Sequence, residues 1–546
     1  MKKLVALLAV FALVFSPVTL GYAVESTFSG VDGEWTTPGS WSNNVPGVND
    51  DAVINADVSA IGGGSGTASI LSAVFNNNAA WISQRNALTL VAGGGTGMVT
   101  FNGGSVNVSG TINGNATFNG GSCNYRGTIN GNTTFNGGSS NQQGAINGNA
   151  AFNDSSVSQY GTINGDATFN GNSGSYFSTI NGDATFNDSS GSNGSTINGD
   201  ATFNGSSVIV RVTINGDATF NGGSYSSFGT INGNATFNGG SYNSHGTITG
   251  NVIFNDSSYN YYGTINGSVV FNLANPNAGN QTGTINAGEA GTVSGNFRTD
   301  SGITFQSGTV SSNINGAGGV TKTGAGTVTF LGANTYTGAT AISAGTLRYG
   351  ANSGSGAVNL NGGTLDLGTH TLTVNGAYTQ AAGTTLALGI ANSSTFGQIV
   401  ATGAVPRVAG GTVNVTPSEY IVGGTTYKIL DGRSGGAALT LPSVTSGSSR
   451  VTFTLAEGTG ADAGDLILTA NRTGTYNTVP TADGNGQAAG SALESAGAAG
   501  AASDMQTVLN TLDGLSNEQL GGALETMSPD VSGGSVLGSR AMMGQF

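Results

Sequence analysis

Charge, cysteine and proline are all scarce in this chain of 546 residues. Lys, Arg, Asp and Glu make up 8% of it, against roughly 25% in an average soluble protein. The net charge of −14 argues against nucleic acid or an anionic membrane as partner, because both are bound by faces rich in Lys and Arg. The single Cys excludes a disulfide scaffold, and nine Pro are too few for collagen.

Glycine, in contrast, is abundant, and the chain is apolar enough to fold. It has 95 Gly and a hydrophobic content of 37%, which argues against a fully disordered chain. Regular structure with so little charge requires paired backbone and stacked side chains. We therefore expect β-structure built from repeats, in which each repeat buries its apolar side against its neighbours.

The N-terminus has the three parts of a secretory signal peptide. Lys2 and Lys3 precede an apolar run over residues 4–15, and small residues around Ala23 follow. The run is shorter than the roughly 20 residues that a membrane-spanning helix needs. The sequence therefore predicts a signal peptide over residues 1–23, cleaved after Ala23, and export through the Sec route.

Residues 24–93 consist of short alternating segments between Gly, Asn and Ser turns, which predicts an N-terminal β cap. Trp35 and Trp41 lie near its start. The first coil of a solenoid needs such cover for its exposed core and edge. An aromatic platform for a sugar is the alternative role for these two side chains.

Residues 94–272 repeat with a period of 17 and no insertion. The unit reads T-I-N-G-N-A-T-F-N-G-G-S, followed by four variable residues and usually Gly. Phe recurs at Phe101, Phe118, Phe135, Phe152, Phe169, Phe186, Phe203, Phe220, Phe237, Phe254 and Phe271. Ile recurs at Ile112, Ile129, Ile146, Ile163, Ile180, Ile197, Ile214, Ile231, Ile248 and Ile265. A helical repeat is excluded, because no 3.6-residue apolar stripe fits a unit this rich in Gly and Asn.

Within the unit, Ile112, Ala116 and Phe118 share one parity, so a period of two places them on one side of a strand, facing a core. Coils stacked in register lie ~4.8 Å apart, which places identical residues above one another. The Phe series then forms an interior stack. The Asn series from Asn102 to Asn272 can form a ladder of side-chain amides.

Glycines mark the predicted corners of each coil. Gly114, Gly120 and Gly121 accept a positive φ cheaply, as tight corners between short strands demand. The chain is thus predicted to be all-β, an elongated β-solenoid (β-helix) with 17-residue coils. A less regular β-solenoid over residues 273–475 and a short C-terminal α-helical segment follow.

The four variable positions of each repeat differ from coil to coil. They include residues 141–143, 175–177, 208–211 and 260–262, with Tyr frequent in the later coils. Variable side chains on an invariant rod are the natural place for a ligand. Drift on a tolerant surface is the other interpretation.

Residues 316–350 carry a motif of a known family. The segments 318–330, 332–338 and 344–347 read GGVTKTGAGTVTF, GANTYTG and AGTL. This pattern resembles the passenger-associated repeat of bacterial autotransporters (type V secretion). The resemblance implies a β-solenoid that is exported and exposed at the outer membrane and cell surface, or secreted.

The C-terminal part resembles the end of such passengers. Residues 424–430 and 465–469 are similar to the last strands of such passengers. Residues 476–546 are predicted to form a linker and helical segment. The helical pattern within it, over residues 486–525, is similar to the linker that precedes the membrane barrel in that family. The chain stops at Phe546, which leaves no room for that barrel, so either the barrel belongs to a part of the gene product beyond this sequence or the passenger does not secrete itself. An outer-membrane translocator is an expected partner if it is encoded separately. The 17-residue block also resembles the β-helical coil of bactofilins, which polymerise.

No catalytic, cofactor-binding or metal-binding residue is predicted. The two histidines, His245 and His370, stand in unrelated segments, which gives no basis for a triad or a metal cluster. The acids of the repeats are predicted to be turn and surface residues. One vertical series of them could alternatively recruit Ca²⁺, since carboxylates at coil spacing repel one another; it comprises Asp166, Asp183, Asp200 and Asp217.

These patterns predict an exported adhesin or structural stalk without catalysis and without a cofactor. Its expected partners are a glycan or protein surface of a host or of the environment. The alternatives are a self-assembling extracellular scaffold and a β-helical enzyme acting on polysaccharide, which would need paired acids. Ice binding by the series that starts at Thr117 is a more distant alternative.

Overall fold

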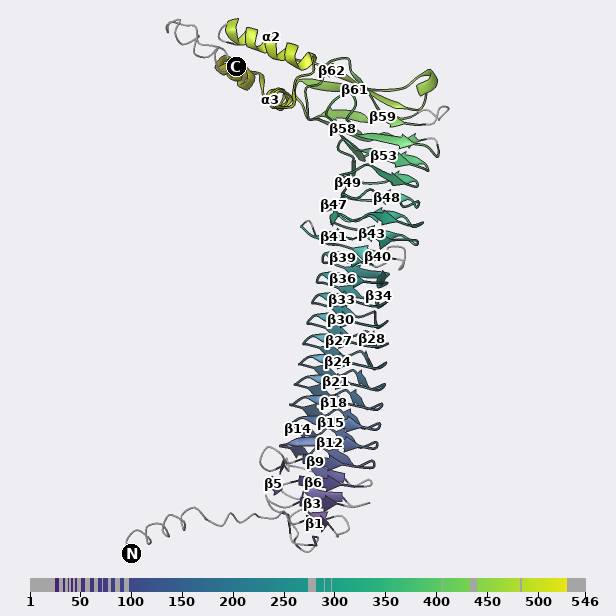
Figure 1. Ribbon diagram of the computed structural model, residues 1–546, viewed down its shortest axis with the longest axis vertical. Coiled ribbons are helices and arrows are strands. Elements are labelled where there is room, and N and C mark those ends of the chain that lie inside the picture. Colours follow the sequence, from purple (N-terminus) through teal and green to yellow (C-terminus); the bar gives the residue numbers. More distant parts are fainter. Residues whose placement is uncertain are drawn as a thin grey trace, which may run out of the picture. The chain divides into compact units, whose positions relative to one another are not determined.

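The computed structural model describes most of residues 98–527 and short segments nearer the N-terminus (Figure 1). Within 98–527 the undescribed positions are 274–280, 289, 296, 405, 433–438 and 482–483. The described N-terminal segments are 25–28, 33–34, 38, 41–42, 45–46, 51–54, 59–62, 67–70, 72–76, 80–83 and 89–92. The expected signal peptide and Trp35 lie outside the described residues. The chain divides into two compact units, Met1–Tyr242 (unit 1) and Asn243–Phe546 (unit 2).

Each 17-residue repeat forms one coil of three short strands. In the coil that contains Phe118 these are β12 (Asn115–Asn119), β13 (Cys123–Tyr125) and β14 (Thr128–Ile129). Each strand pairs in parallel with its equivalent 17 residues on, for example Phe118 with Phe135 and Ile112 with Ile129. The chain is therefore a parallel β-solenoid of 17-residue coils, as predicted, with one sheet for each strand of the coil (Figure 1).

The strands of unit 1 form three series. The first is β1 (Glu25–Phe28), β3 (Asp51–Ile54), β6 (Ser72–Phe75), β9 (Met98–Phe101), β12, β15 (Thr133–Asn136), β18 (Ala150–Phe152), β21 (Ala167–Phe169), β24 (Ala184–Phe186), β27 (Ala201–Phe203), β30 (Ala218–Phe220) and β33 (Ala235–Phe237). The second is β2 (Gly33–Glu34), β4 (Ser59–Gly62), β7 (Ala80–Ser83), β10 (Val106–Val108), β13, β16 (Ser140–Gln142), β19 (Val157–Gln159), β22 (Gly174–Tyr176), β25 (Gly191–Asn193), β28 (Val208–Val210) and β31 (Tyr225–Ser227). The third is β5 (Thr67–Ile70), β8 (Thr89–Ala92), β11 (Thr111–Ile112), β14, β17 (Ala145–Ile146), β20 (Thr162–Ile163), β23 (Thr179–Ile180), β26 (Thr196–Ile197), β29 (Thr213–Ile214) and β32 (Thr230–Ile231). Unit 1 ends within β34 (Tyr242–Ser244).

Stacked phenylalanines form the core of unit 1, as the period predicts. From Phe101 to Phe237 every ring of the series is fully buried, with neighbouring centroids 4.6–5.0 Å apart and planes within 13° of parallel. The Ile series is buried as well. Full burial of one such side chain contributes roughly 1.5–3 kcal/mol to the free energy of folding. Because these side chains are buried against the equivalent residues of adjacent coils, each coil is stabilised chiefly by its neighbours.

Two ladders of asparagine amides accompany the aromatic stack. Asn119 Nδ2 donates to Asn102 Oδ1 at 2.9 Å, and the predicted series continues in this way to Asn238. A second ladder, which the sequence analysis did not identify, runs from Asn113 to Asn232. Each amide both donates and accepts, so the polar corners are satisfied along the coils.

The two kinds of corner glycine have different causes. Gly120 and Gly121 have φ of +62° and +78°, as predicted. The same prediction for Gly114 and its equivalents is wrong, because their φ lies outside the left-handed region. At that corner, a Cβ on Gly131 would lie 2.4 Å from the carbonyl oxygen of Gly114 in the preceding coil. Glycine is required there by close packing between coils.

Unit 2 also consists of parallel coils. Its first coils keep the 17-residue spacing, as between Val252 and Val269, whereas later register partners such as Val413 and Val444 are farther apart in sequence. Its strands up to residue 360 are β35 (Thr247–Ile248), β36 (Val252–Asn255), β37 (Tyr259–Tyr261), β38 (Gly263–Ile265), β39 (Val269–Asn272), β40 (Gly283–Ile285), β41 (Thr292–Ser294), β42 (Phe297–Arg298), β43 (Ile303–Phe305), β44 (Gly308–Val310), β45 (Ile314–Asn315), β46 (Val320–Lys322), β47 (Thr327–Phe330), β48 (Thr340–Ile342), β49 (Thr346–Tyr349), β50 (Ser353–Ser355) and β51 (Val358–Leu360). Further parallel strands are β52 (Thr364–Asp366), β53 (Thr371–Val374), β54 (Tyr378–Gln380), β55 (Thr385–Ile390), β56 (Gln398–Ala401), β57 (Arg407–Val408), β58 (Thr412–Pro417) and β60 (Ser443–Ser446).

The C-terminal end of unit 2 departs from the solenoid pattern. β59 (Thr426–Asp431), β62 (Leu466–Arg472) and β61 (Val451–Glu457) pair in antiparallel fashion. The predicted helical segment consists of three helices, α2 (Gly484–Ala498), α3 (Ser503–Asp513) and α4 (Asn517–Met527). Their buried leucines pack with Tyr420, which lies between β58 and β59, and with Tyr476, which follows β62, so this segment is folded onto unit 2 (Figure 1). The residues of this core are Tyr420, Tyr476, Val479, Leu509, Leu512, Leu520 and Leu524.

Candidate binding surface

One corner of each coil holds its residue in the left-handed conformation. The residue that follows the second strand has φ between +51° and +58° whenever it is not Gly, and its N–H bonds to the next coil, as Tyr160 N does to Tyr176 O at 3.0 Å. Such a backbone costs of order 1–3 kcal/mol for a non-glycine residue and persists only where its surroundings fix it. We call this series in unit 1 the corner column; it comprises Ser109, Arg126, Gln143, Tyr160, Phe177, Gly194, Arg211 and Phe228.

Large exposed side chains of unit 1 gather on the corner column. Tyr160, Phe177 and Phe228 are 56%, 53% and 57% exposed, and Tyr176 precedes one of them. Among the described residues of unit 1, Met98 is the one large hydrophobic side chain of similar exposure elsewhere. Exposed aromatic groups collected on one edge are typical of a binding surface.

Neighbouring members of the corner column contact one another. The rings of Tyr160 and Phe177 stack with centroids 5.4 Å apart, and Arg126 Nε donates to Gln143 Oε1 at 2.8 Å. A Cβ on Gly194 would lie 2.6 Å from the Phe177 ring, so that ring lies over the glycine of the next coil. The column is therefore a ridge in which neighbouring side chains contact one another at these points.

One of the four variable positions of each coil, the middle residue of the second strand, points inward, whereas all four were expected on the surface. Asn124 and Asn141 are fully buried, and Asn124 Nδ2 donates both to Asn141 Oδ1 and to the carbonyl of Gly127. A Cβ on Gly127 would collide with these amides, which explains the Gly that usually ends the repeat. Where Ser replaces the inner Asn, Ser can replace that Gly, as Ser175 and Ser195 show with oxygens 3.0 Å apart.

The vertical acid series has a structural role. Asp166 Oδ1 accepts the backbone N–H of Asp183, and each later member does the same for the next coil at 2.7–3.0 Å. Asn115 Oδ1 makes the same bond to Asn132 N, so Asp and Asn are equivalent here. No group of three or more His, Cys, Asp or Glu within the described part of the chain could hold a metal ion.

The remaining single residues of interest lie apart from one another. His245 lies among Tyr261 and Tyr262, whereas His370 follows β52. Trp41 packs edge-on against Phe28 at 5.0 Å, which fits the predicted covering role. Burial raises the pKa of the Cys123 thiol, which disfavours the reactive thiolate.

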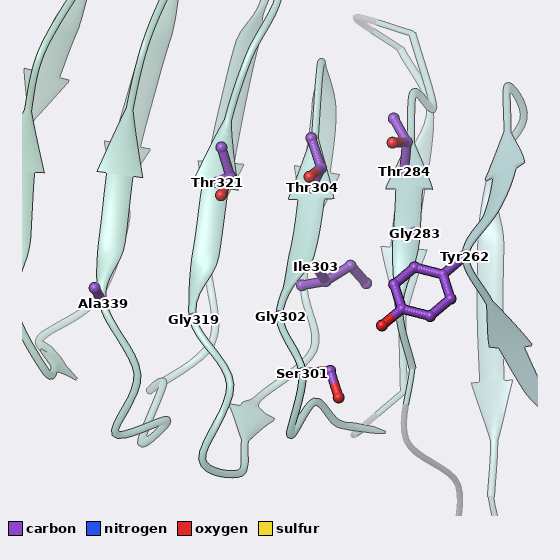
Figure 2. Close-up of a pocket in the computed structure, with 10 residues that line it drawn as sticks. All are labelled: Tyr262, Gly283, Thr284, Ser301, Gly302, Ile303, Thr304, Gly319, Thr321 and Ala339. Atoms are coloured by element: carbon purple, nitrogen blue, oxygen red, sulfur yellow. The ribbon is translucent and has the colours of Figure 1, made fainter.

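A surface groove of about 550 Å³ lies beside Tyr262 in unit 2 (Figure 2). Three outward threonines, Thr284, Thr304 and Thr321, occupy register positions on the neighbouring strands β40, β43 and β46. Figure 2 shows these side chains in a row and the Tyr262 ring directed toward the coils of Gly283 and Ile303. The groove thus combines an aromatic wall with a row of hydroxyl groups.

The motif at residues 318–347 forms buried polar bonds between coils. Lys322 is fully buried, and its Nζ donates to the carbonyls of Thr323, Gly324 and Ala344 at 2.6–3.1 Å. The Tyr336 hydroxyl lies 2.5 Å from Thr340 Oγ1, and burial raises the pKa of this tyrosine. A buried ammonium surrounded by backbone oxygens closes a corner, so this Lys has a structural role.

The C-terminal helices are tied to the last strand by a buried charged cluster. Arg472 lies between Glu494 and Asp513, with its guanidinium carbon 3.9 Å from the centre of the Tyr420 ring. The Tyr476 hydroxyl lies 2.8 Å from Asp513 Oδ1, and burial followed by that carboxylate raises the pKa of Tyr476 well above its ordinary value. The Arg472 guanidinium is thus shared by two carboxylates, and each of these groups contacts a partner within the cluster.

Stacked parallel coils, inter-coil amide ladders and a variable exposed edge define a parallel β-solenoid. The model of the passenger-associated-transport-repeat family matches residues 320–348, from β46 into β49. This repeat is typical of proteins that are secreted and exposed at the cell surface. No curated protein and no solved structure matches the chain. Among the described residues, none of the helices has the length and apolar character needed to cross a bilayer.

Proposed function

We propose that this chain is an exported, non-catalytic adhesin that displays the corner column as its binding face. The gathering of Tyr160, Phe177 and Phe228 on one edge of unit 1 is the observation that supports it. The rest of the coil is committed to stacking, so binding residues vary only where stacking does not constrain them. The partner is a glycan or protein surface outside the cell, reached with an outer-membrane translocator.

The chemistry of the titratable groups favours binding over catalysis. The acid series accepts backbone N–H groups between coils, and the Arg472 cluster is occupied with holding helices. General acid–base catalysis on a polysaccharide would require a pair of carboxyl groups facing a shared substrate site. The ridge of aromatic, Arg and Gln side chains suits contact with another surface instead.

Retention of protein-coated beads under flow tests the proposal. The purified chain is immobilised on beads, which pass over mucin, collagen and microbial polysaccharide coatings. Tyr160→Asn, Phe177→Asn and Phe228→Asn are combined in one variant, because Asn tolerates the left-handed conformation. We expect retention to fall at least about tenfold, since aromatic contacts dominate such surfaces.

The matched control replaces three outward threonines of the first strand series, Thr168, Thr185 and Thr236, by Asn, and it should be retained like the natural chain. Equal retention of both variants would show that the corner column is not the binding face. Absence of retention on every coating, together with filaments of the purified chain in electron micrographs, would instead favour a self-assembling scaffold.

A further inference from the structure

The groove beside Tyr262 exists because projecting side chains cease at this corner. Tyr262 has φ of +53°, as in the corner column, and is half-exposed. The residues that precede the next paired strands are Thr282, which is buried, and then Gly302, Gly319 and Ala339. The tyrosine therefore forms a step, with backbone and small side chains as the floor beyond it (Figure 2).

The Tyr262 ring is fixed before any ligand arrives. Its backbone N–H donates to the buried Thr282 Oγ1 at 2.9 Å. The ring contacts Tyr261 edge-on at 4.6 Å and lies 5.5 Å from the His245 ring. A wall held by its neighbours loses little conformational freedom on binding, which favours affinity.

The lining of the groove selects an uncharged, hydroxyl-rich ligand. None of its ten lining residues is charged. Thr284, Thr304 and Thr321 present a donor and an acceptor each, repeated along the solenoid at roughly 4.8 Å. A tyrosine face adds a large apolar surface with a polar tip. A pyranose ring has the matching form, with one face of C–H groups and a rim of hydroxyls.

We propose that this groove binds a linear neutral oligosaccharide, with one sugar ring stacked on Tyr262 and its neighbours hydrogen-bonded to the threonine row. The volume of about 550 Å³ lies within the range of roughly 300–1,000 Å³ that ligand sites occupy. The inference deepens the proposed adhesive function and rests on it, since it gives that function a carbohydrate ligand and a second site in unit 2.

Calorimetric titration of the full chain tests the site. The probes are cellohexaose, maltohexaose and chitohexaose, with a hyaluronan oligosaccharide as the charged comparison. We expect at least one neutral probe to bind, and Tyr262→Asn to weaken it at least about tenfold while preserving the left-handed corner. Tyr262→Phe should stay within about threefold of the natural chain, because the ring is retained.

The threonine row is tested by a matched pair. Thr304→Val should weaken binding about three- to tenfold through loss of one hydrogen bond. Thr309→Val, on an outward position of β44 outside the groove, should leave binding unchanged. Circular dichroism confirms that each variant is folded.

Two results would overturn the inference. One is that no neutral probe binds at about 10 mM, a concentration that detects even interactions of about −3 kcal/mol. The other is that Tyr262→Asn binds as the natural chain does. Bead retention that persists in either case, and still depends on the corner column, would leave the adhesive function standing without this ligand. If the chain binds neutral sugars but its beads are not retained, the sugar site would stand without the adhesive function.

Discussion

Arg472 and Asp513, which are 41 residues apart in the sequence, form a bidentate ion pair. The guanidinium Nη1 and Nη2 groups donate to Oδ2 and Oδ1 of the carboxylate at 3.0 and 2.8 Å. Both side chains are about 95% buried. The pair joins the last strand, β62, to the end of α3, so the helices depend on it.

Removal of one partner should release the helices. In Asp513→Ala the Arg472 charge stays buried with Glu494 alone, and we expect a loss of about 3–5 kcal/mol in the local stability of residues 484–527. Hydrogen exchange of these helices measures it. Arg348→Ala breaks the Arg348–Asp366 pair at its exposed partner and should cost under about 1 kcal/mol. Equal protection of the helices in both variants would contradict a supporting role for the buried pair.

Alkaline pH should destabilise unit 2. Burial raises the pKa of Tyr336, Tyr349, Tyr378 and Tyr476 above their ordinary value of about 10. The folded chain therefore retains protons that the unfolded chain releases. The contribution of these tyrosines to the free energy of unfolding is complete below pH ~10 and declines as pH rises further.

Thermal unfolding of the full chain between pH 8 and about pH 11 measures this decline. Tyr378→Phe removes one of the raised groups, and its stability should fall less steeply with pH than that of the natural chain. A melting temperature that does not change above pH ~10 would refute the expectation.

Truncation within the Phe stack should disrupt neighbouring coils. Phe169→Ala leaves a cavity between Phe152 and Phe186, and we expect a cost of about 3–5 kcal/mol. Because each coil contacts only its neighbours, hydrogen exchange should rise in adjacent coils first. Thr168→Ala, one residue away and facing outward, should change stability by less than about 0.5 kcal/mol. Uniform loosening of the whole solenoid would argue against local cooperativity.

The two glycine corners should respond differently to substitution. A Cβ at Gly199 would lie 2.6 Å from the Gly182 backbone, so Gly199→Ala must push two coils apart. Gly223 has φ of +84° and open space around a Cβ, so Gly223→Asn should be tolerated, since Asn accepts this conformation. Denaturant midpoints measure the difference. A lower midpoint for Gly223→Asn than for Gly199→Ala would reverse our assignment of the two causes.

The period and parity of the repeat were sufficient to predict the core. Phe118, Ile112 and the Asn102 series depend only on a 17-residue period and alternation along a strand, and both are local properties of the sequence. The variable positions were predicted as one surface, yet Asn141 is buried and Gln143 points outward. The outward direction of Gln143 follows from the left-handed backbone conformation at the corner. The residue types in the corner column do not indicate this conformation, so it could not be predicted from the sequence.

The C-terminal end of unit 2 was less predictable. Leu509, Leu512 and Leu520 indicated helices, but the charged cluster joins Arg472, Glu494 and Asp513 from three separate elements, and long-range pairing leaves no periodic signal. The groove was missed for a related reason. The groove forms because small residues follow Tyr262 at the same corner of the next coils. The positions of Gly302, Gly319 and Ala339 at that corner are known only once the coils are aligned.

Because the stacked residues repeat, the core alone does not define which coil pairs with which. The contact of Phe177 with Gly194 is one feature that differs between coils. Shifting unit 1 by one whole coil would again place Phe on Phe and Asn on Asn, so the core alone tolerates misregistered pairing. Such a slip would place a residue other than Gly194 under the Phe177 ring, where a Cβ meets ring carbons at 2.6 Å. The Phe177 ring would have to move to accept such a residue, so the exposed edge distinguishes between coils that the core treats as equivalent.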